Sequence, residues 1–329
     1  MKYGAVWIAA LLSLVLKLIA VKILIPILKR QHIGQSIKRD GPIWHLSKEG
    51  TPTMGGIMFI VGILVSVLAA VLMDQTLRSA LVPFAFALLQ GAIGVLDDCK
   101  KLQHKKNEGL KGREKLLIQL VVSVAFVLLM RYLGCLSPNL YIPFVGSSIP
   151  LSEPLYAAFC AFVIVGTVNA VNLTDGADGL VSGVSLPPVL GMAALALHWG
   201  MKAQGLYALL VAAGILGFLC YNHYPAKVFM GDTGSLFLGG SICAIAFALD
   251  MPLALIPFGI IYILEALSDI IQVLYFKLTH GKRFFRMAPI HHHFEKGGWS
   301  EWKVFSVFSG VSLLFAIVTC LCLWSRYGL

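Results

Sequence analysis

Long uninterrupted runs of apolar residues dominate the pattern along this chain. A helix needs about 17–25 residues to cross a bilayer, and ten of the runs reach or approach that length. None of them shows the ten-residue alternation that is typical of a membrane β-barrel, so each run predicts a spanning helix. The predicted spans are roughly 4–27, 54–73, 80–96, 116–134, 155–172, 180–197, 205–221, 234–249, 252–276 and 304–324.

The polar connections between these runs are short. The longest, 277–303, has 27 residues, which is too few for a separate domain. Residues 1–329 are therefore expected to form a single all-α polytopic membrane domain. The first run carries Lys17 and Lys22 and is followed by no small-residue cleavage pattern, so it predicts a retained helix and not a signal peptide.

Composition supports this class of protein. The chain is 58% apolar and 13% charged, against about 45–50% and about 25% in a soluble domain, which excludes an ordinary soluble enzyme and a disordered chain. Its net charge of +10 is expected at an anionic membrane surface and not on nucleic acid. The seven cysteines form no CxxC pair and are expected to be buried apolar residues: Cys99, Cys135, Cys160, Cys220, Cys243, Cys320 and Cys322.

Basic residues are distributed unevenly between the two sets of loops. One set holds 19 Lys and Arg residues and the other set holds five. Because basic loops stay in the cytoplasm, both termini are expected outside. The predicted cytoplasmic loops, 28–53, 97–115, 173–179, 222–233 and 277–303, also hold 11 of the 16 acidic residues.

Two adjacent carboxylates follow the third apolar run. Asp97 and Asp98 stand at the membrane edge, where their mutual repulsion and desolvation favour a hard cation such as Mg²⁺. The alternative is a solvated helix terminus. The same loop is rich in lysine, and Lys101 and Lys115 are candidate members of the site.

The segment NAVNLTDGADGL, 169–180, offers amides, carboxylates and glycines. Its polar residues recur every third position, which suits a sugar, a uracil ring or a metal-bound phosphate. A capped turn between two helices explains the same composition. The candidate substrate-binding residues are Asn169, Asn172, Asp175 and Asp178.

A glycine-rich turn precedes the eighth apolar run. Its backbone N–H groups could bind an anion, and Asp232 could hold a bridging cation. A simple N-cap is the alternative. Asn222 and Phe229, slightly earlier, offer a hydrogen bond and a stacking face. KEGTPTMGG, 48–56, adds Lys48 and Thr53 to the same side of the membrane.

Three consecutive histidines, His291, His292 and His293, lie in the last cytoplasmic loop. Consecutive side chains diverge, so contact with phosphate is expected in preference to a transition-metal site. Within the ninth span, Glu265 and Asp269 share a helix face with Gln272, and either function or an interhelical hydrogen bond accounts for them.

All of these candidates fall on one predicted side of the membrane. The predicted polar end of the apolar helices carries carboxylates, amides, lysines and histidines. This combination favours an enzyme that joins a charged soluble substrate to a lipid. A transporter would place charges at mid-membrane, where only Glu265 and Asp269 lie, and a structural scaffold needs no clustered Asp and Asn.

At these residues the sequence resembles the phospho-N-acetylmuramoyl-pentapeptide transferase family, one of the polyprenyl-phosphate N-acetylhexosamine-1-phosphate transferases. The ten-span count agrees with that family, and Pro257 would match its bent ninth helix. The matching strings are KEGTPTMGG at 48–56, GVLDDCKK at 94–101, NAVNLTDGADGL at 169–180, VFMGDTGSLFLGG at 228–240 and APIHHHFEKGGW at 288–299.

The resemblance implies transfer of phospho-N-acetylmuramoyl-pentapeptide from its UDP-linked precursor to undecaprenyl phosphate. The products would be lipid I and UMP, with Mg²⁺ as cofactor, in the bacterial cytoplasmic membrane. Family members often form dimers, so a homodimer is one expectation. By position, the resemblance implies that one group of residues is catalytic: Asp97, Asp98, Asp232, Lys115, His291, His292 and His293. Of these, Asp232 would bind Mg²⁺. Asn172, Asp175 and Asp178 would belong to the loop that binds the nucleotide sugar, and Lys48, Asn222 and Phe229 would lie around the uridine.

Two mechanisms fit these residues. In one, Asp97 or Asp98 is a nucleophile that forms a phospho-enzyme. In the other, Asp98 takes a proton from the lipid phosphate, which attacks the nucleotide directly. We favour direct attack because a lipid phosphate is already a competent nucleophile. A sister transferase that uses UDP-N-acetylglucosamine is the closest alternative, and APIHHHFE argues against it.

Overall fold

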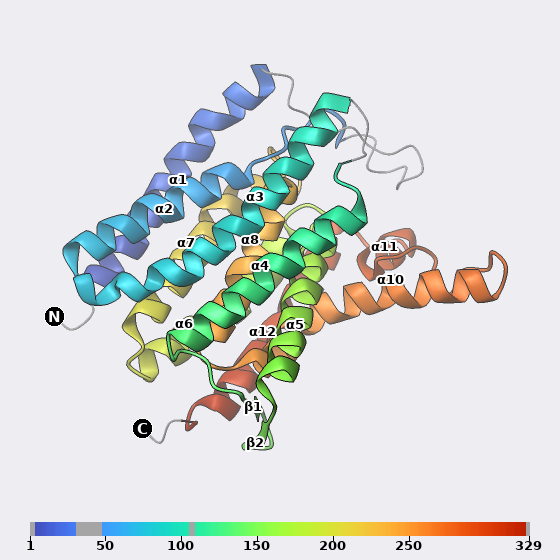
Figure 1. Ribbon diagram of the computed structural model, residues 1–329. Coiled ribbons are helices and arrows are strands. Elements are labelled where there is room, and N and C mark those ends of the chain that lie inside the picture. The colour runs from blue at the N-terminus through green and yellow to red at the C-terminus, as the bar shows by residue number, and fades with distance from the viewer. Residues whose placement is uncertain (1–3, 31–47, 105–108, 327–329) are drawn as a thin grey trace.

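The computed structural model describes residues 4–30, 48–104 and 109–326, and over these residues the protein is almost entirely helical (Figure 1). A two-stranded hairpin, β1 (Asn139–Ile142) with β2 (Ser147–Pro150), is the sheet found there. The helices are α1 (Gly4–Arg30), α2 (Gly56–Met73), α3 (Leu81–His104), α4 (Gly112–Tyr132), α5 (Glu153–Thr174), α6 (Leu180–His198), α7 (Lys202–Asn222), α8 (Gly231–Ala248), α9 (Leu255–Phe258), α10 (Ile260–Leu278), α11 (Ile290–Lys296) and α12 (Glu301–Leu323), with short 3₁₀ turns at Gln75–Ala80 and Pro252–Ala254.

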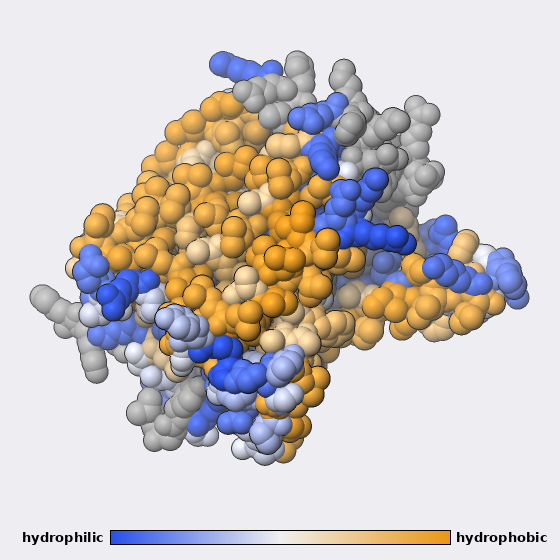
Figure 2. Space-filling view, viewed as in Figure 1, coloured by the Kyte–Doolittle hydropathy of each residue, from blue (hydrophilic) through white to orange (hydrophobic). Residues whose placement is uncertain are grey.

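The number of spans agrees with the apolar pattern. Within the described ranges, nine helices are long and apolar enough to cross a membrane, and the pair α9–α10 makes a tenth, bent by 81°. The bend falls at Gly259, two residues after Pro257. A Cβ added at Gly259 would lie 2.5 Å from the Leu255 carbonyl oxygen. Figure 2 shows the resulting apolar band with hydrophilic residues at both ends. The predicted all-α membrane fold is confirmed.

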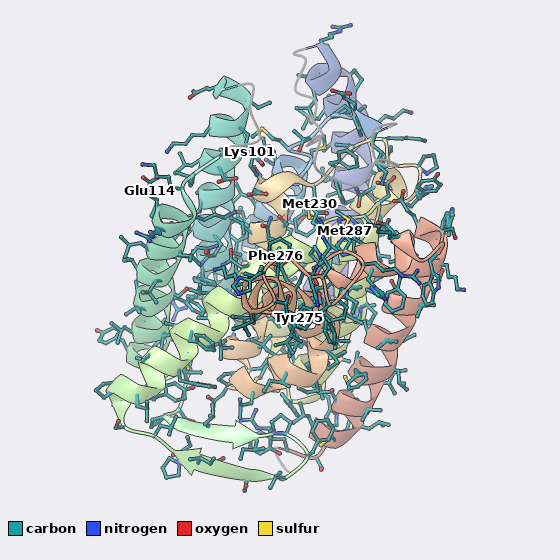
Figure 3. All side chains as sticks on the ribbon, turned by 90° about the vertical axis from the view of Figure 1, so that its right-hand side faces the viewer. Lys101, Glu114, Met230, Tyr275, Phe276 and Met287 are labelled. Atoms are coloured by element: carbon teal, nitrogen blue, oxygen red, sulfur yellow. The ribbon has the colours of Figure 1, made fainter. Side chains whose placement is uncertain are left out.

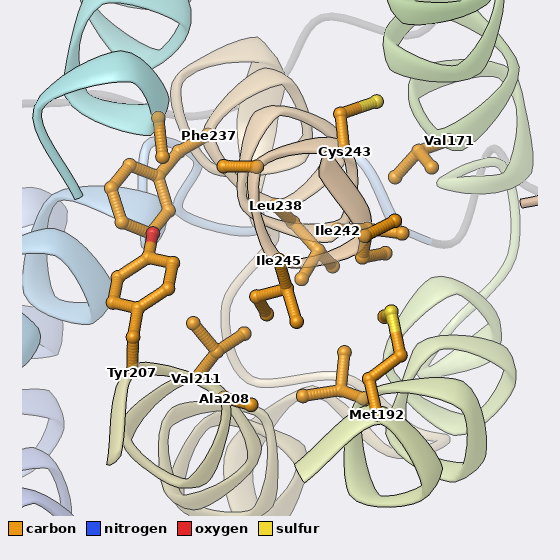
Figure 4. Close-up of a cluster of buried hydrophobic side chains, with 14 of the residues drawn as sticks. Val171, Met192, Tyr207, Ala208, Val211, Phe237, Leu238, Ile242, Cys243 and Ile245 are labelled. Atoms are coloured by element: carbon orange, nitrogen blue, oxygen red, sulfur yellow. The ribbon is translucent and has the colours of Figure 1, made fainter. Parts of the chain in front are cut away.

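Helix α8 lies at the centre of the bundle, with every residue from Thr233 to Ala248 buried. Its side chains pack against α5, α6 and α7, as the cluster in Figure 4 shows. The sequence of α8 is rich in Gly, Ser and Ala, and small residues allow membrane helices to approach closely. The position of α8 therefore depends on its neighbours on all sides.

Glycines set the closest approaches to α8. At Gly94 of α3, an added Cβ would lie 2.2 Å from the Asp232 carbonyl oxygen, and at Gly56 of α2 it would lie 2.2 Å from the Gly234 Cα. Both distances are shorter than any carbon contact allows. The two glycines therefore bring α2 and α3 against the first turn of α8, where Asp232 lies.

The charge inside the first span is buried. Lys17 of α1 is 1% exposed, and its Nζ donates to Ser13 Oγ at 3.0 Å and to the Leu210 carbonyl of α7 at 3.1 Å. Its aliphatic stem lies against Gly62 of α2 and Gly217 of α7. A buried, hydrogen-bonded lysine of this kind joins α1 to the bundle, as expected for a helix that is part of the fold.

The predicted polar connections are partly helical. Asp97, Asp98 and Lys101 lie on α3, which continues past its apolar run to His104, so Asp97 and Asp98 stand at a helix end, although a buried one and not a solvated one. Lys115 lies in the first turn of α4, and the histidine tract lies on the short helix α11. Polar helix ends continue the backbone hydrogen bonds of the apolar segment, so hydropathy alone underestimates helix length.

The β hairpin was not predicted. It pairs Asn139 with Pro150 and Ile142 with Ser147 in antiparallel register. Each strand has four residues, too few for a recognisable alternation. In Figure 1 the hairpin lies at the end of the bundle where α1 begins and α12 ends, opposite the polar end of α3.

The topology can be tested by cysteine labelling. We expect Lys296→Cys to resist an impermeant thiol reagent in intact cells and Thr76→Cys to react, because basic loops stay in the cytoplasm. The expectation that all seven cysteines are buried was wrong for Cys135 and Cys220, which are exposed, so both are first replaced by Ser. Permeabilised cells, in which both sites should react, are the control. Labelling at Lys296 with protection at Thr76 would invert the predicted orientation.

Candidate functional site

Four helix ends meet at the polar end of the bundle. They are the last turns of α3 and α5 and the first turns of α4 and α8. Figure 3 places Lys101 of α3 close to Met230, the residue before α8 begins. Because each helix is fixed by apolar packing along its length, the polar side chains at these ends are held in one small region.

Asp98 of α3 binds the start of α8. Its Oδ2 accepts hydrogen bonds from Thr233 N at 2.9 Å and from Thr233 Oγ1 at 2.7 Å, and its Oδ1 accepts one from Asp232 N at 3.2 Å. The first N–H groups of a helix have no partner within the helix, and a carboxylate is stabilised beside them. Asp98 is thus the cap of α8, supplied by a different helix.

Lysines and carboxylates alternate around Asp232. Lys101 Nζ lies 2.7 Å from Asp97 Oδ2 and 3.1 Å from Asp232 Oδ2, and Lys115 Nζ lies 2.8 Å from the same Asp232 oxygen. Asp97 also accepts a hydrogen bond from Leu110 N at 2.8 Å. The structure therefore brings Asp97, Asp232, Lys101 and Lys115 together, as the sequence predicts.

The two asparagines of α5 have different partners. Asn172 Nδ2 donates to Asp232 Oδ1 at 3.1 Å and to Ser235 Oγ at 2.7 Å, so this side chain orients the central carboxylate. Asn169 lies about one turn earlier and donates to Gln119 Oε1 of α4 at 2.8 Å. Asn172 belongs to the acidic cluster, whereas Asn169 makes an interhelical hydrogen bond beneath it.

Asp97, Asp98 and Asp232 could hold a metal ion. One oxygen from each lies within 4.8 Å of the others, and this is the group of metal-ligand type found in the described ranges. Hard oxygen ligands suit Mg²⁺. The two lysine amines already lie against Asp232 and Asp97, which shows that these oxygens accept positive charge. The donor set fits a magnesium ion.

A second cluster lies beside the first. Lys48 Nζ contacts Asp178 Oδ1 and Glu301 Oε2, both at 2.7 Å. Asp178 Oδ2 accepts from Ala226 N at 2.8 Å. Asn222 is 2% exposed; its Oδ1 accepts from Gly179 N and its Nδ2 donates to the Val228 carbonyl. Lys48, Asp178 and Asn222 are thus joined in one frame.

Backbone pairing connects this frame to the acidic cluster. Phe229 N donates to the Pro52 carbonyl at 2.8 Å, and Gly55 N donates to the Phe229 carbonyl at 2.9 Å. Thr53, in the same segment, lies against Gly231, where a Cβ would meet Thr53 Oγ1 at 3.1 Å. The structure therefore places Thr53 at the start of α8 and Phe229 two residues before it.

His291 is the histidine that faces the α5–α6 turn. It is fully buried, and its Nδ1 lies 2.9 Å from Glu265 Oε2 of α10. A Cβ at Gly176 would lie 2.4 Å from His291 Nε2, so only glycine fits there. In the part of the chain that the structure describes, His291 Nε2 has no hydrogen-bond partner. The buried Nε2 atom of His291, which can donate or accept a hydrogen bond, is thus directed at the turn that carries Asp175.

The other two histidines have different hydrogen-bond partners. His292 Nδ1 lies 2.7 Å from Glu295 Oε2, but its ring lies beside that of His291, with the centroids 4.0 Å apart. His293 Nδ1 accepts a hydrogen bond from Arg286 N at 3.1 Å, and its ring packs edge-on against Phe285. The expected divergence of the three side chains therefore holds for His293, which braces the segment before α11, and not for His291 and His292.

Sequence reasoning missed two of these partners. Glu301 was counted only as an acidic loop residue, and Glu265 was singled out without a link to His291. Their partners lie 253 and 26 residues away, so no local pattern could have paired them. Glu265 is an intramembrane carboxylate, which is a signal in itself; Glu301 had none beyond its charge. Asp269, one turn further along α10, is partly exposed.

Asp175 follows α5, and its carboxyl lies among other carboxylates. Desolvation raises the pKa of its carboxyl well above the usual range, and the nearby carboxylates of Asp232, Asp98 and Asp178 add to that rise. A group of this kind lowers the stability of the fold as pH rises above the unfolded-state pKa of about 3.9, until the raised folded-state pKa is passed.

Replacing this carboxyl should therefore stabilise the protein. We expect Asp175→Asn to raise the thermal unfolding midpoint by about 2–4 °C at about pH 7.5, with the difference shrinking towards pH ~4. Asp74→Asn is the matched control, because hydrogen bonds from Thr76 lower the pKa of the exposed Asp74 carboxyl, and it should give no rise. A lower midpoint for Asp175→Asn at neutral pH would contradict this account.

Comparison with known proteins agrees with this geometry. Residues 80–250 match the model named Glycosyl transferase family 4, and residues 48–60 match phospho-N-acetylmuramoyl-pentapeptide-transferase signature 1. These segments contain both clusters except for Glu301 of α12, and they do not include the histidine helix α11.

Full-length relatives bear the same name, phospho-N-acetylmuramoyl-pentapeptide-transferase. The one from Clostridium acetobutylicum is 44% identical over 324 residues, covering 97% of this chain and 99% of the relative. Those from Staphylococcus carnosus and Staphylococcus aureus (strain RF122) are 42% and 43% identical over 315 residues, covering 95% of this chain and 98% of each relative. Because the similarity extends over nearly the whole chain, this membrane protein belongs to the phospho-N-acetylmuramoyl-pentapeptide transferase family.

Proposed function

We propose that the protein transfers phospho-N-acetylmuramoyl-pentapeptide from its UDP-linked precursor to undecaprenyl phosphate, giving lipid I and UMP. The observation that carries this proposal is the cluster of Asp97, Asp98 and Asp232 at the polar ends of apolar helices, with Lys101 and Lys115 against it. A site at the polar ends of membrane helices can bind a soluble nucleotide from the aqueous side and the phosphate of a lipid from the membrane side.

The proposal includes location and organisation. The chain acts as one polytopic domain, 1–329, in the bacterial cytoplasmic membrane, with both clusters on the cytoplasmic side. Its partners are the soluble nucleotide donor, the polyprenyl phosphate and the surrounding lipids, and not nucleic acid. Association of two copies into a homodimer stays a prediction.

Asp232 and Asp97 would hold Mg²⁺, and Asp98 would lie beside the ion, kept in place by its hydrogen bonds to the start of α8. When bound, the ion supplies positive charge that neutralises phosphate oxygens and stabilises a departing phosphate. Asn172 and the α8 backbone keep Asp232 in place. Lys101 and Lys115, which contact the same carboxylate, are placed to bind phosphate oxygens of the substrates.

The direct route is compatible with the residues at this site. An oxygen of the lipid phosphate forms a bond to the sugar-bearing phosphorus, and the bond from that phosphorus to the UMP oxygen breaks. A proton on the lipid phosphate passes to Asp98, whose Oδ1 accepts a single hydrogen bond, at 3.2 Å, and so keeps a free lone pair. The α8 start fixes the orientation of that carboxylate.

The donor nucleotide would occupy the second cluster. Lys48 and Phe229 offer a cation and an aromatic face, and Asn222 supports them through its hydrogen bonds to Gly179 N and the Val228 carbonyl, which suits a uridine. Asp175 and the α5–α6 turn lie between this frame and the acidic cluster. His291 Nε2 is buried against Gly176 of that turn and has no partner among the described residues, so it would reach a phosphate oxygen of the donor when the turn moves on binding.

The assay for this function is UMP release from UDP-N-acetylmuramoyl-pentapeptide with polyprenyl phosphate. We expect release only when Mg²⁺ is present, and little with UDP-N-acetylglucosamine as donor. No release from the muramoyl donor under any condition would contradict the proposed function. Release from the N-acetylglucosamine donor alone would assign the chain to the sister transferases.

Asp232→Asn tests the metal-holding residue. The substitution keeps the size of the side chain and removes its charge, and turnover should fall about 100-fold or more, as for loss of one electrostatic stabiliser. Glu114→Gln, at a half-exposed carboxylate beside Lys100, should stay within about twofold. Near-normal turnover of Asp232→Asn at low Mg²⁺ would remove Asp232 from the metal site.

Single alanine substitutions test the histidines. His291→Ala should cost the most activity because His291 faces the α5–α6 turn, and His293→Ala the least because His293 braces the preceding segment. A structural zinc site predicts instead that purified protein carries stoichiometric zinc, lost when the tract is mutated. Metal analysis that found such zinc would overturn the phosphate-contact interpretation.

A further inference from the structure

Glu301 lies where three distant segments meet. It is the first residue of α12, and its Oε2 accepts hydrogen bonds from Lys48 Nζ at 2.7 Å and from Asp178 N at 3.1 Å. The side chains of Lys48, Asp178 and Glu301 are only 12%, 3% and 11% exposed. One carboxylate oxygen thus joins the segment before α2, the α5–α6 turn and the last helix.

The local structure of α12 favours this placement. Ser300 caps the helix by accepting a hydrogen bond from Lys303 N. A carboxylate in the first turn is favourably placed in the field of the helix dipole, and its two hydrogen bonds hold Glu301 at a fixed point. The remainder of α12 is an apolar span packed against α6, which makes it a rigid support.

The partners of Glu301 are the residues that the proposed function assigns to the donor nucleotide. Lys48 lies between Glu301 and Asp178, at 2.7 Å from each. Asp178 continues to Ala226, and the adjacent Gly179 N donates to Asn222. Removing Glu301 would therefore release the Lys48 amine on one side and the backbone of the α5–α6 turn on the other.

We propose that Glu301 is a positioning residue for the donor nucleotide. It holds Lys48 and the Asp178 turn in the arrangement that binds the uridine diphosphate end of the donor, and it acts through them without touching the reacting phosphates. This inference rests on the proposed function, because it takes the frame around Lys48 to be the donor subsite.

Charge and position predict opposite effects of removing Glu301. Loss of a negative charge would strengthen attraction of an anionic nucleotide, but that effect is weakened by solvent and salt at a partly exposed site. Removing Glu301 also breaks its hydrogen bonds with Lys48 and Asp178, so these residues are no longer held in place, and this is the larger contribution. The loss of correct positioning of Lys48 and Asp178 is therefore expected to dominate, and affinity for the donor should fall.

Two substitutions separate these contributions. Glu301→Gln removes the charge and keeps one acceptor, whereas Glu301→Asp keeps the charge and shortens the side chain by one methylene. Both should raise the KM for the UDP-linked donor about tenfold, with kcat and the KM for polyprenyl phosphate within about twofold. Glu49→Gln, at the exposed neighbour of Lys48, is the control and should match wild type.

A second measurement does not depend on turnover. Binding of UMP to the purified protein, followed by titration calorimetry, should weaken by a similar factor in both Glu301 variants and not in Glu49→Gln. The double variant Lys48→Gln/Glu301→Gln should lose less UMP affinity than the sum of the two single losses, because Glu301 acts partly through Lys48 and partly through the Asp178 turn. Thermal unfolding midpoints identify any variant that fails to fold, and Glu301→Asp then replaces Glu301→Gln.

The outcomes distinguish the inference from the proposed function. A wild-type protein that releases no UMP contradicts the proposed function, whatever Glu301 does. If wild type is active, an unchanged donor KM in a folded Glu301→Asp variant overturns the positioning role. A fall in kcat with both KM values unchanged overturns it too, because that result would place Glu301 in the chemical step.

Discussion

The site depends on the contact between the Asp98 carboxylate and the first turn of α8. Two backbone N–H groups of α8 and one hydroxyl are satisfied by this side chain from α3. The contact requires the backbones to be close, and Gly94 permits it because any side chain there would collide with the Asp232 carbonyl. Asp232 is the residue of α8 whose backbone lies against Gly94. Its position relative to Asp97 and the two lysines is thus determined by helix packing and not by a flexible loop.

This arrangement concentrates negative charge where water is scarce. Asp97, Asp98 and Asp232 lie within one small volume, and Asp175 next to them has a pKa raised well above its usual range by burial and by those neighbours. Lys101 and Lys115 offset part of that charge. A site with four carboxylates and two amines still favours cations, which explains why it suits a metal ion bound with phosphate. Electrostatic strain of this kind is characteristic of functional sites, because a fold selected only for stability would not retain it.

The sequence predicted the spans and most of the acidic cluster for clear physical reasons. Apolar runs of spanning length have few alternatives, and carboxylates at the ends of such runs are rare unless they have a role. Local signals could not reveal which ends meet. Glu301 pairs with Lys48 across 253 residues, and Glu265 of α10 pairs with His291 of α11 across 26. How far α3 and α4 extend beyond their apolar runs could not be decided from composition, because polar helical turns and polar loops have similar compositions.

In the described part of the chain, the turn between α5 and α6 contacts both clusters and the histidine helix. Asp175 lies near the acidic cluster, Gly176 lies against His291, and Asp178 binds Lys48 and Glu301. Two of its residues are glycines for steric reasons: Gly176 leaves room for the imidazole, and Gly179 has φ +73. Neighbouring residues of so short a turn cannot move independently. A ligand that shifts Asp178 at the Lys48 side therefore also shifts Asp175 and the contact with His291, which gives the proposed donor subsite a direct mechanical connection to the residues that would handle its phosphates.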